Sequence, residues 1–124
     1  MAREAGLAGR RVLVVEDEFL IALDVEDALG ELGCEVMGPV PSVAAALDLL
    51  GAGRCDVAVL DVHLGEGSTA PLAQALGERR IPFVVLTGYE RSQIDEPLLR
   101  EAPLIGKPLQ RATLRKALLA ALDL

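Results

Sequence analysis

Acidic residues follow two apolar runs of the chain, and carboxylates are side chains that bind hard metal ions or act as nucleophiles. Asp61 comes directly after the aliphatic run 57–60, and three consecutive acids, residues 16–18, follow the run 12–15. An unbroken aliphatic run predicts a buried strand with apolar neighbours on both faces. Because a charge is costly to bury, we expect these carboxylates at the carboxyl ends of the strands, the edge where ligands collect in open parallel sheets.

Two more polar residues stand in equivalent positions. Thr87 follows the apolar run 83–86, and Lys107 comes shortly after the run 103–105. Clustered carboxylates repel one another strongly in a partly dry site, so we expect Lys107 and a divalent cation to offset their charge. Mg²⁺ is the expected cation, since it prefers oxygen ligands and keeps several waters. A metal, an amine and a hydroxyl around Asp61 are the parts needed for phosphoryl transfer to that carboxylate.

The elements that carry these residues alternate between apolar strands and amphipathic helices, five times over. This alternation predicts an α/β fold, a doubly wound parallel sheet of five strands with helices on both faces, hence three layers. The predicted strands are residues 11–15, 34–37, 55–60, 83–86 and 103–105. Apolar residues spaced for one helical face mark three of the helices; they are Ile21, Val25, Ala28, Leu29 and Leu32, then Val43, Ala46, Leu47 and Leu50, and finally Leu114, Ala117, Leu118 and Ala121.

Several residues mark where these elements begin and end. Gly33 is placed to close the first helix in the left-handed conformation, and Ser42 is a suitable cap for the second helix. The glycine- and proline-containing run 38–41 predicts a turn. A helix is expected from about residue 69 to residue 76. Pro97 interrupts the following helical segment, which we expect to be short or irregular.

Composition limits the classes of function. A chain of 124 residues suits one domain, and residues 1–10 are expected to form a flexible arm. The net charge of −7 disfavours binding to nucleic acid. No apolar run is long enough for a signal peptide or a membrane span, so we expect no membrane association and a cytoplasmic location. Cys34 and Cys55 stand apart from any Cys-x-x-Cys motif, which favours two buried reduced thiols and leaves a disulfide open.

From residue 11 to its end, the chain resembles the receiver domains of two-component response regulators. Four signals carry the resemblance, each at the end of a predicted strand: the acidic run 16–18, Leu60-Asp61-Val62, Thr87-Gly88 and Lys107-Pro108. Each signal alone is weak, but all four in this order are specific. The resemblance implies a flavodoxin-like fold with strand order 2-1-3-4-5 and a receiver domain over residues 11–124.

The resemblance also implies a role for each acidic position. Asp61 would accept a phosphoryl group from a phosphohistidine on a histidine kinase or histidine phosphotransferase, forming an aspartyl phosphate. Asp17 would bind Mg²⁺ directly, together with Asp61, and Glu16 would bind it through water. The backbone carbonyl of His63 would be a further ligand. Lys107 would pair with Asp61 and then with the phosphoryl oxygens, and the Lys107–Pro108 peptide would be cis.

Thr87 would move to hydrogen-bond the phosphoryl group, but its usual aromatic partner is replaced. That partner stands three residues before the lysine, where this chain has Leu104; an aromatic residue occurs instead at Tyr89. The run 85–90 is similar to the Phe-Ala-Thr-Gly-Tyr-Gly motif of atypical alphaproteobacterial receivers, with Val85, Leu86 and Glu90 as its departures. We therefore expect Tyr89 and the segment near Pro97 to carry the conformational change, and His63 and Tyr89 to tune the lifetime of the phosphoryl group.

Other functions compete with this interpretation. Glu16 to Glu18 would suit an ordinary helix start, because acids favour that position. A haloacid-dehalogenase-type phosphatase would need a second aspartate at position 63, which is His63, and room for a cap domain. A flavin binder would need aromatic residues for the flavin and a phosphate-binding loop, and the sequence shows neither. A phosphorylation-independent docking module stays open, as do a receiver cut from a hybrid kinase and a homodimer. We expect a switch that acts on an unknown downstream protein, with no separate substrate and so no enzyme in the usual sense.

Overall fold

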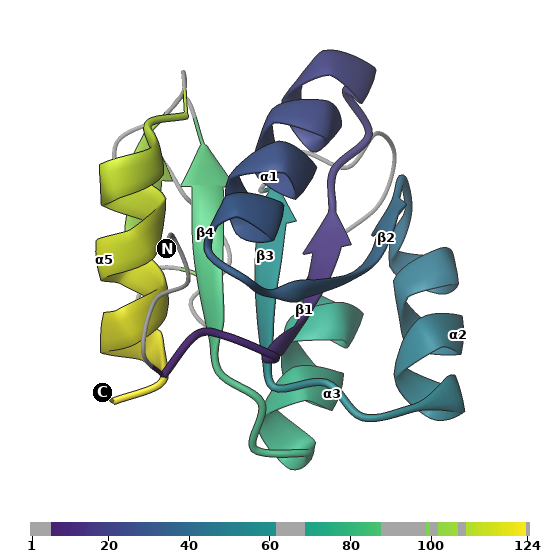
Figure 1. Cartoon of the computed structure of the whole chain (residues 1–124). Helices are drawn as coiled ribbons and strands as arrows, with labels where there is room; N and C mark the ends of the chain where they lie inside the picture. Colours follow the sequence, from purple (N-terminus) through teal and green to yellow (C-terminus); the bar gives the residue numbers. More distant parts are fainter. Residues whose placement is uncertain (1–5, 62–68, 88–98, 100–101, 107–108, 124) are drawn as a thin grey trace.

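Five parallel strands form one sheet in the order β2-β1-β3-β4-β5 (Figure 1). The computed structural model describes residues 6–61, 69–87, 99, 102–106 and 109–123. The predicted fold and strand order are confirmed. The strands are β1 (Arg11–Val15), β2 (Glu35–Val40), β3 (Val57–Asp61), β4 (Phe83–Thr87) and β5 (Leu104–Gly106).

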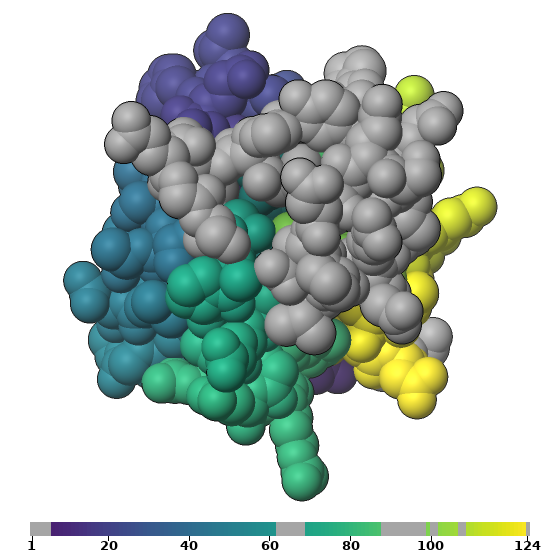
Figure 2. Space-filling model, turned by 180° about the vertical axis from the view of Figure 1, so that it is seen from behind, coloured from purple at the N-terminus to yellow at the C-terminus, as the bar shows by residue number. Residues whose placement is uncertain are grey.

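The described helices cover both faces of the sheet, which gives the predicted three layers (Figure 1). The first helix and the last pack on one face, and the other two pack on the opposite face, where α2 and α3 lie against each other (Figure 2). The helices are α1 (Phe19–Glu31), α2 (Val43–Ala52), α3 (Ala70–Glu78) and α5 (Arg111–Ala121).

Alternation along the strands supplies both core layers. Successive strand residues point to opposite faces, so aliphatic runs bury side chains on both sides of the sheet. Toward α2 and α3 point Leu13, Val15, Ala58, Leu60 and Val85. Toward α1 and α5 point Val12, Val14, Val57, Val59, Val84 and Leu86. All eleven are buried, and for this reason the three central strands have near-continuous aliphatic sequences.

The flexible arm predicted for residues 1–10 is wrong for residues 6–10. Leu7 is fully buried in the core layer of α1 and α5. The amide of Gly9 donates a hydrogen bond of 2.8 Å to the carbonyl of Gly33, at the end of α1. Burying one leucine side chain contributes about 1.5–3 kcal/mol, which holds this otherwise small and polar segment on the domain. Residues 1–5 lie outside the described residues.

Strand β2 is longer than predicted, because it continues through part of the run 38–41 that was expected to be a turn. Its pairing with β1 is irregular between Leu13 and Val15, and Gly38 has a φ of +100°. The irregular pairing accommodates Gly38 and Pro39 within the strand, and the Gly38–Pro39 peptide bond is cis. Beyond it, the pairing of Val40 with Val15 brings β2 level with the end of β1.

The expected helix ends are mostly confirmed. The hydroxyl of Ser42 accepts a 3.1 Å hydrogen bond from the amide of Ala45, and Gly33 has the left-handed φ of +87°. Helix α3 begins one residue later and ends two residues later than expected. Leu47 is 36% exposed, contrary to its predicted core position, because α2 buries Ala46 and Leu50 and turns Leu47 toward solvent.

The segment around Pro97 and the Lys107–Pro108 peptide lie outside the described residues, so the expectations for them stay predictions. Among the helices that are described, none combines the length and the apolar character needed to cross a bilayer.

Replacement of Gly38 by alanine should lower the free energy of unfolding by about 1–3 kcal/mol. A Cβ atom at Gly38 would lie 2.8 Å from the amide nitrogen of Val40 and 3.1 Å from the carbonyl oxygen of Val14, and the φ of +100° strains any other residue. Urea denaturation measures the change. Gly51→Ala is the matched control: its Cβ meets nothing within 4 Å, and stability should stay equal or rise by up to about 1 kcal/mol. Equal effects of both variants would contradict this account.

Cys34 and Cys55 are free and half-buried rather than fully buried. Burial raises the pKa of both thiols, so the thiolate is less populated in the folded than in the unfolded chain. We expect both to react with a disulfide reagent at pH 8 more slowly than in urea. Because the folded-state pKa is raised, their contribution to stability is complete below the unfolded pKa and is lost as the pH rises through the folded value. Equal rates in folded and unfolded protein would contradict the prediction.

Candidate functional site

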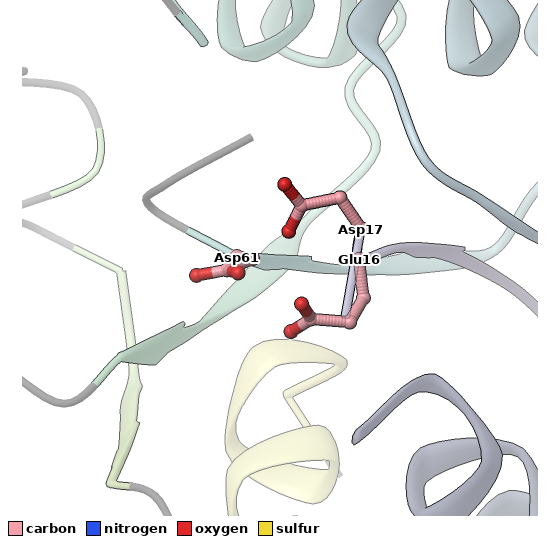
Figure 3. A group of neighbouring side chains, drawn as sticks. All are labelled: Glu16, Asp17 and Asp61. Carbon is pink, nitrogen blue, oxygen red and sulfur yellow. The ribbon is translucent and has the colours of Figure 1, made fainter. Parts of the chain in front are cut away.

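Three carboxylates meet at the carboxyl edge of the sheet, as the sequence predicted. Glu16 and Asp17 directly follow β1, and Asp61 is the last residue of β3, the neighbouring strand. Each residue offers a carboxylate oxygen, and these oxygens all lie within 4.8 Å of one another. Figure 3 shows the side chains of Glu16 and Asp17 extending to the side on which Asp61 lies.

Burial differs among the three. Glu16 and Asp61 are only 4% and 3% exposed, whereas Asp17 is exposed. The backbone holds Glu16 from two sides: its amide donates a 3.0 Å hydrogen bond to the carbonyl of Val40, in β2, and its carboxylate accepts a 2.9 Å hydrogen bond from the amide of Glu18. Glu18 is the N-cap residue of α1, where free amides favour a negative partner.

The donor set fits a hard divalent cation. Two unit charges ~4 Å apart repel by about 4 kcal/mol at an effective dielectric constant of about 20, so three clustered carboxylates disfavour the folded state unless positive charge offsets them. All three donors are oxygens, the ligands that Mg²⁺ prefers. Exposed Asp17 leaves one side of the cluster open to the waters that Mg²⁺ retains. Glu16, Asp17 and Asp61 can therefore hold a metal ion.

Thr87 lies where the sequence placed it. It is the last residue of β4 and is fully buried. Asp61 pairs with Leu86 across the β3–β4 ladder, so Thr87 stands one residue beyond the partner of Asp61 on the adjacent strand, and neighbouring strands are about 4.8 Å apart. The hydroxyl group of Thr87 therefore belongs to the same sheet edge as the carboxylates.

Lys107, His63 and Tyr89 lie outside the described residues, and their roles stay predictions. Gly106, which precedes Lys107 in the sequence, ends β5 and pairs with Thr87.

The sequence did not reveal a groove that adjoins the acidic cluster. Helix α1 and the end of β2 line it, and Glu16 and Asp17 belong to its wall. Phe19 also lines the groove, 72% exposed. The sequence carried one signal for this residue. Phe19 follows three consecutive acids and precedes the apolar face of α1 without belonging to that face.

Comparison with protein families gives one clear match. The model of the response regulator receiver domain matches residues 12–119, so the match includes both apolar strands that lead to the acidic cluster. It also extends through β4 and β5 into α5.

Individual proteins are similar over most of the chain. The solution structure of SdrG from Pseudomonas melonis Fr1 in a BeF3-activated conformation is 42% identical and has a TM-score of 0.79, covering 93% of this chain and 98% of SdrG. The transcriptional regulatory protein PdtaR of Mycobacterium tuberculosis is 33% identical over 88 residues, which are 70% of this chain and 43% of PdtaR. The phyllosphere-induced regulator PhyR of Methylorubrum extorquens is 28% identical over 114 residues, 90% of this chain and 43% of PhyR.

The chain thus spans less than half the length of PdtaR and PhyR, but nearly the whole of the SdrG chain. The structural neighbours are receiver domains of the SdrG and PhyR type. The resemblance inferred from the four strand-end signals is confirmed at this level.

Mg²⁺ should raise the stability of the protein, and Asp17→Asn should reduce that effect while stabilising the metal-free protein. The asparagine removes one of the three repelling charges and one charged metal ligand. At a Mg²⁺ concentration ten times Kd, binding adds about 1.4 kcal/mol to the free energy of unfolding. Thermal unfolding with and without Mg²⁺, after treatment with EDTA, measures both effects. Asp48→Asn, an exposed acid on α2, is the control and should respond to Mg²⁺ as the wild type does. An unchanged Mg²⁺ affinity in Asp17→Asn would count against the cluster as the metal site.

Proposed function

This chain belongs to the response regulator receiver domains, and on that basis we propose that Asp61 is the phosphoacceptor of a two-component phosphorelay. The observation that carries the proposal is the burial of Asp61 at the end of the central strand, with carboxylate oxygens of Glu16 and Asp17 within 4.8 Å. The similarity to SdrG, which adopts a BeF3-activated conformation, supports it.

The donor would be a phosphohistidine on a histidine kinase or a histidine phosphotransferase. A carboxylate oxygen of Asp61 attacks the phosphorus atom, and an O–P bond forms as the N–P bond breaks. The electron pair of that bond stays on the imidazole nitrogen of the donor, which takes up a proton to leave as a neutral imidazole. Burial of Asp61 limits the access of water, and so favours transfer to the carboxylate over hydrolysis.

Mg²⁺ fits this proposal as the resident metal. Asp17 and Asp61 would bind it directly, Glu16 through water, and the backbone carbonyl of His63 would add a further ligand. When bound, the metal neutralises charge on the carboxylates and on the phosphoryl oxygens. Two hydrogen bonds fix the position of Glu16 before any metal binds: its backbone amide donates one to the carbonyl of Val40, and its carboxylate accepts one from the amide of Glu18.

The remaining residues would act on the phosphoryl group itself. The hydroxyl of Thr87, on the strand next to Asp61, would donate a hydrogen bond to a phosphoryl oxygen. Lys107 would contribute a positive charge to the same oxygens. His63 and Tyr89 would set the lifetime of the aspartyl phosphate by shielding it from water. Tyr89 would also replace the aromatic residue that receivers usually have at the position of Leu104.

The output would be a contact with another protein. Response regulator receiver domains are signalling modules, and two relatives are named as regulators, PdtaR and PhyR. The net charge of −7 argues against direct binding of this chain to nucleic acid, so we assign the output to a partner protein in the cytoplasm.

Incubation with Mg²⁺ and acetyl phosphate should add one phosphoryl group to the wild-type chain, detected by intact-protein mass. Asp61→Asn should gain none, whereas Asp48→Asn should gain one. Thr87→Val keeps the packing and removes the hydroxyl. It should be phosphorylated about 10- to 100-fold more slowly, because a hydrogen bond to a charged group contributes about 1.5–3 kcal/mol.

A phosphoryl group on Asp61→Asn would move the acceptor to another residue. No gain on the wild type, either from acetyl phosphate or from phosphorylated histidine kinases, would overturn the proposed function.

A further inference from the structure

Strand β2 contains an extra residue where it approaches the acidic cluster. Between the pairs Leu13–Met37 and Val15–Val40, two residues of β2 stand opposite Val14, a single residue of β1. Two residues against one form a β-bulge, which disrupts the ladder locally and bends the strand. Bulges are frequent beside functional sites, where they redirect a neighbouring group. This bulge lies two residues before the first acid of the cluster.

The bulge residues are Gly38 and Pro39, and neither suits a regular strand. Pro39 has no N–H group to donate to the ladder, and a bulge leaves one residue unpaired. Gly38 has a φ of +100°, which other residues rarely adopt. A Cβ atom on it would lie 2.8 Å from the amide nitrogen of Val40 and 3.1 Å from the carbonyl oxygen of Val14. The bulge therefore closes this tightly only because position 38 has no side chain.

The residue after the bulge holds the first acid of the cluster. The carbonyl of Val40 accepts the 3.0 Å hydrogen bond from the amide of Glu16. The pairing of β1 with β3 ends one residue earlier, at Val15 and Leu60, so this bond to β2 extends the sheet to Glu16. The carboxylate of Glu16 accepts the 2.9 Å hydrogen bond from the amide of Glu18. Glu16 is thus held at its backbone and at its side chain, and the backbone bond depends on the bulge.

The position of Glu16 matters most for an ion with strict geometry. Mg²⁺ demands near-ideal octahedral coordination, whereas Ca²⁺ accepts a flexible arrangement of ligands at longer distances. A displaced carboxylate therefore disfavours Mg²⁺ more than Ca²⁺. Residues that orient a metal ligand without touching the metal typically change the affinity about 10- to 100-fold when they are replaced.

We propose that Gly38 is a positioning residue for the metal site, and that its bulge places Glu16 so that the site prefers Mg²⁺ to Ca²⁺. The inference rests on the metal site of the proposed function. Gly38 acts through one intermediate: its missing side chain lets Val40 lie close to β1, and Val40 fixes the backbone of Glu16. The control of metal preference therefore lies in β2, the strand at the edge of the sheet, which carries none of the three acids.

The test measures the Kd of Mg²⁺ and of Ca²⁺ for the full chain by titration followed in amide NMR spectra. Gly38→Ala should weaken Mg²⁺ binding about tenfold, and Ca²⁺ binding should weaken less because Ca²⁺ accepts a displaced ligand. The ratio of the two Kd values is the readout, since both ions bind the same folded chain. Hydrogen exchange of the Glu16 amide reports the bond to Val40 and should accelerate more than exchange of the amides of β3.

Two control variants separate the position of Glu16 from the stability of the chain. Gly51→Ala makes the same chemical change in α2, where the new Cβ atom meets nothing within 4 Å. Val57→Ala shortens a fully buried side chain at the amino end of β3, and so lowers stability away from the bulge. Both controls should keep the wild-type ratio of the Mg²⁺ and Ca²⁺ Kd values.

A second variant, Pro39→Gly, provides the test if Gly38→Ala does not fold. It adds no atom to the bulge but releases the φ angle that proline fixes, so Val40 is held less firmly. The Kd of Mg²⁺ should rise in Pro39→Gly as well, again with a smaller rise for Ca²⁺.

An unchanged ratio of Kd values in Gly38→Ala and Pro39→Gly would overturn the positioning role while leaving the metal site intact. An equal shift in Val57→Ala would do the same, because it would make stability the cause. A wild-type chain that binds Ca²⁺ as tightly as Mg²⁺ would also contradict the proposal. No binding of either ion by the wild type would instead overturn the metal site, which belongs to the proposed function.

Discussion

Repulsion among three carboxylates is the constraint on which the functional end of this structure depends. Glu16, Asp17 and Asp61 bring like charges within 4.8 Å, and two of them are nearly inaccessible to water. Such an arrangement is unfavourable by itself, and the rest of the sheet must hold it together. The packed aliphatic strands hold the three residues at the edge of the sheet, and Glu16 is also held by its hydrogen bonds to β2 and to the start of α1. The folded chain therefore has a site at one edge of the sheet that attracts positive charge.

The sequence predicted the parts of the structure that follow from strong local rules. Aliphatic runs that end on carboxylates identify buried parallel strands, and parallel strands end at one edge, so Asp61 and the acids after β1 had to meet. Ser42 and Gly33 were recognised because caps have specific chemistry. Thr87 was placed for the same reason as the acids. The sequence alone was therefore enough to predict that three distant segments, the ends of β1, β3 and β4, meet at one edge of the sheet.

The errors come from residues whose type permits two outcomes. Gly38 and Pro39 suit either a turn or an irregular strand, and only the pairing partner in β1 decides between them. Leu7 is a single leucine in a small and polar segment, with no periodicity to reveal its burial. Leu47 lies in a helix so rich in alanine and leucine that its inner face is ambiguous. Phe19 was missed because an exposed aromatic beside acids matches no pattern of the core.

The position of Leu7 also fixes where the chain can be attached to something else. It packs in the same core layer as Leu118 and Leu122, near the end of α5, and α5 runs antiparallel to the strands. The start of the described chain (purple) and the end of α5 (yellow) therefore lie together at the amino edge of the sheet, opposite the carboxylates (Figure 1). A fluorescent protein or a surface tether joined at either point would stand away from the acidic edge, and two dyes placed there would report on each other rather than on the site.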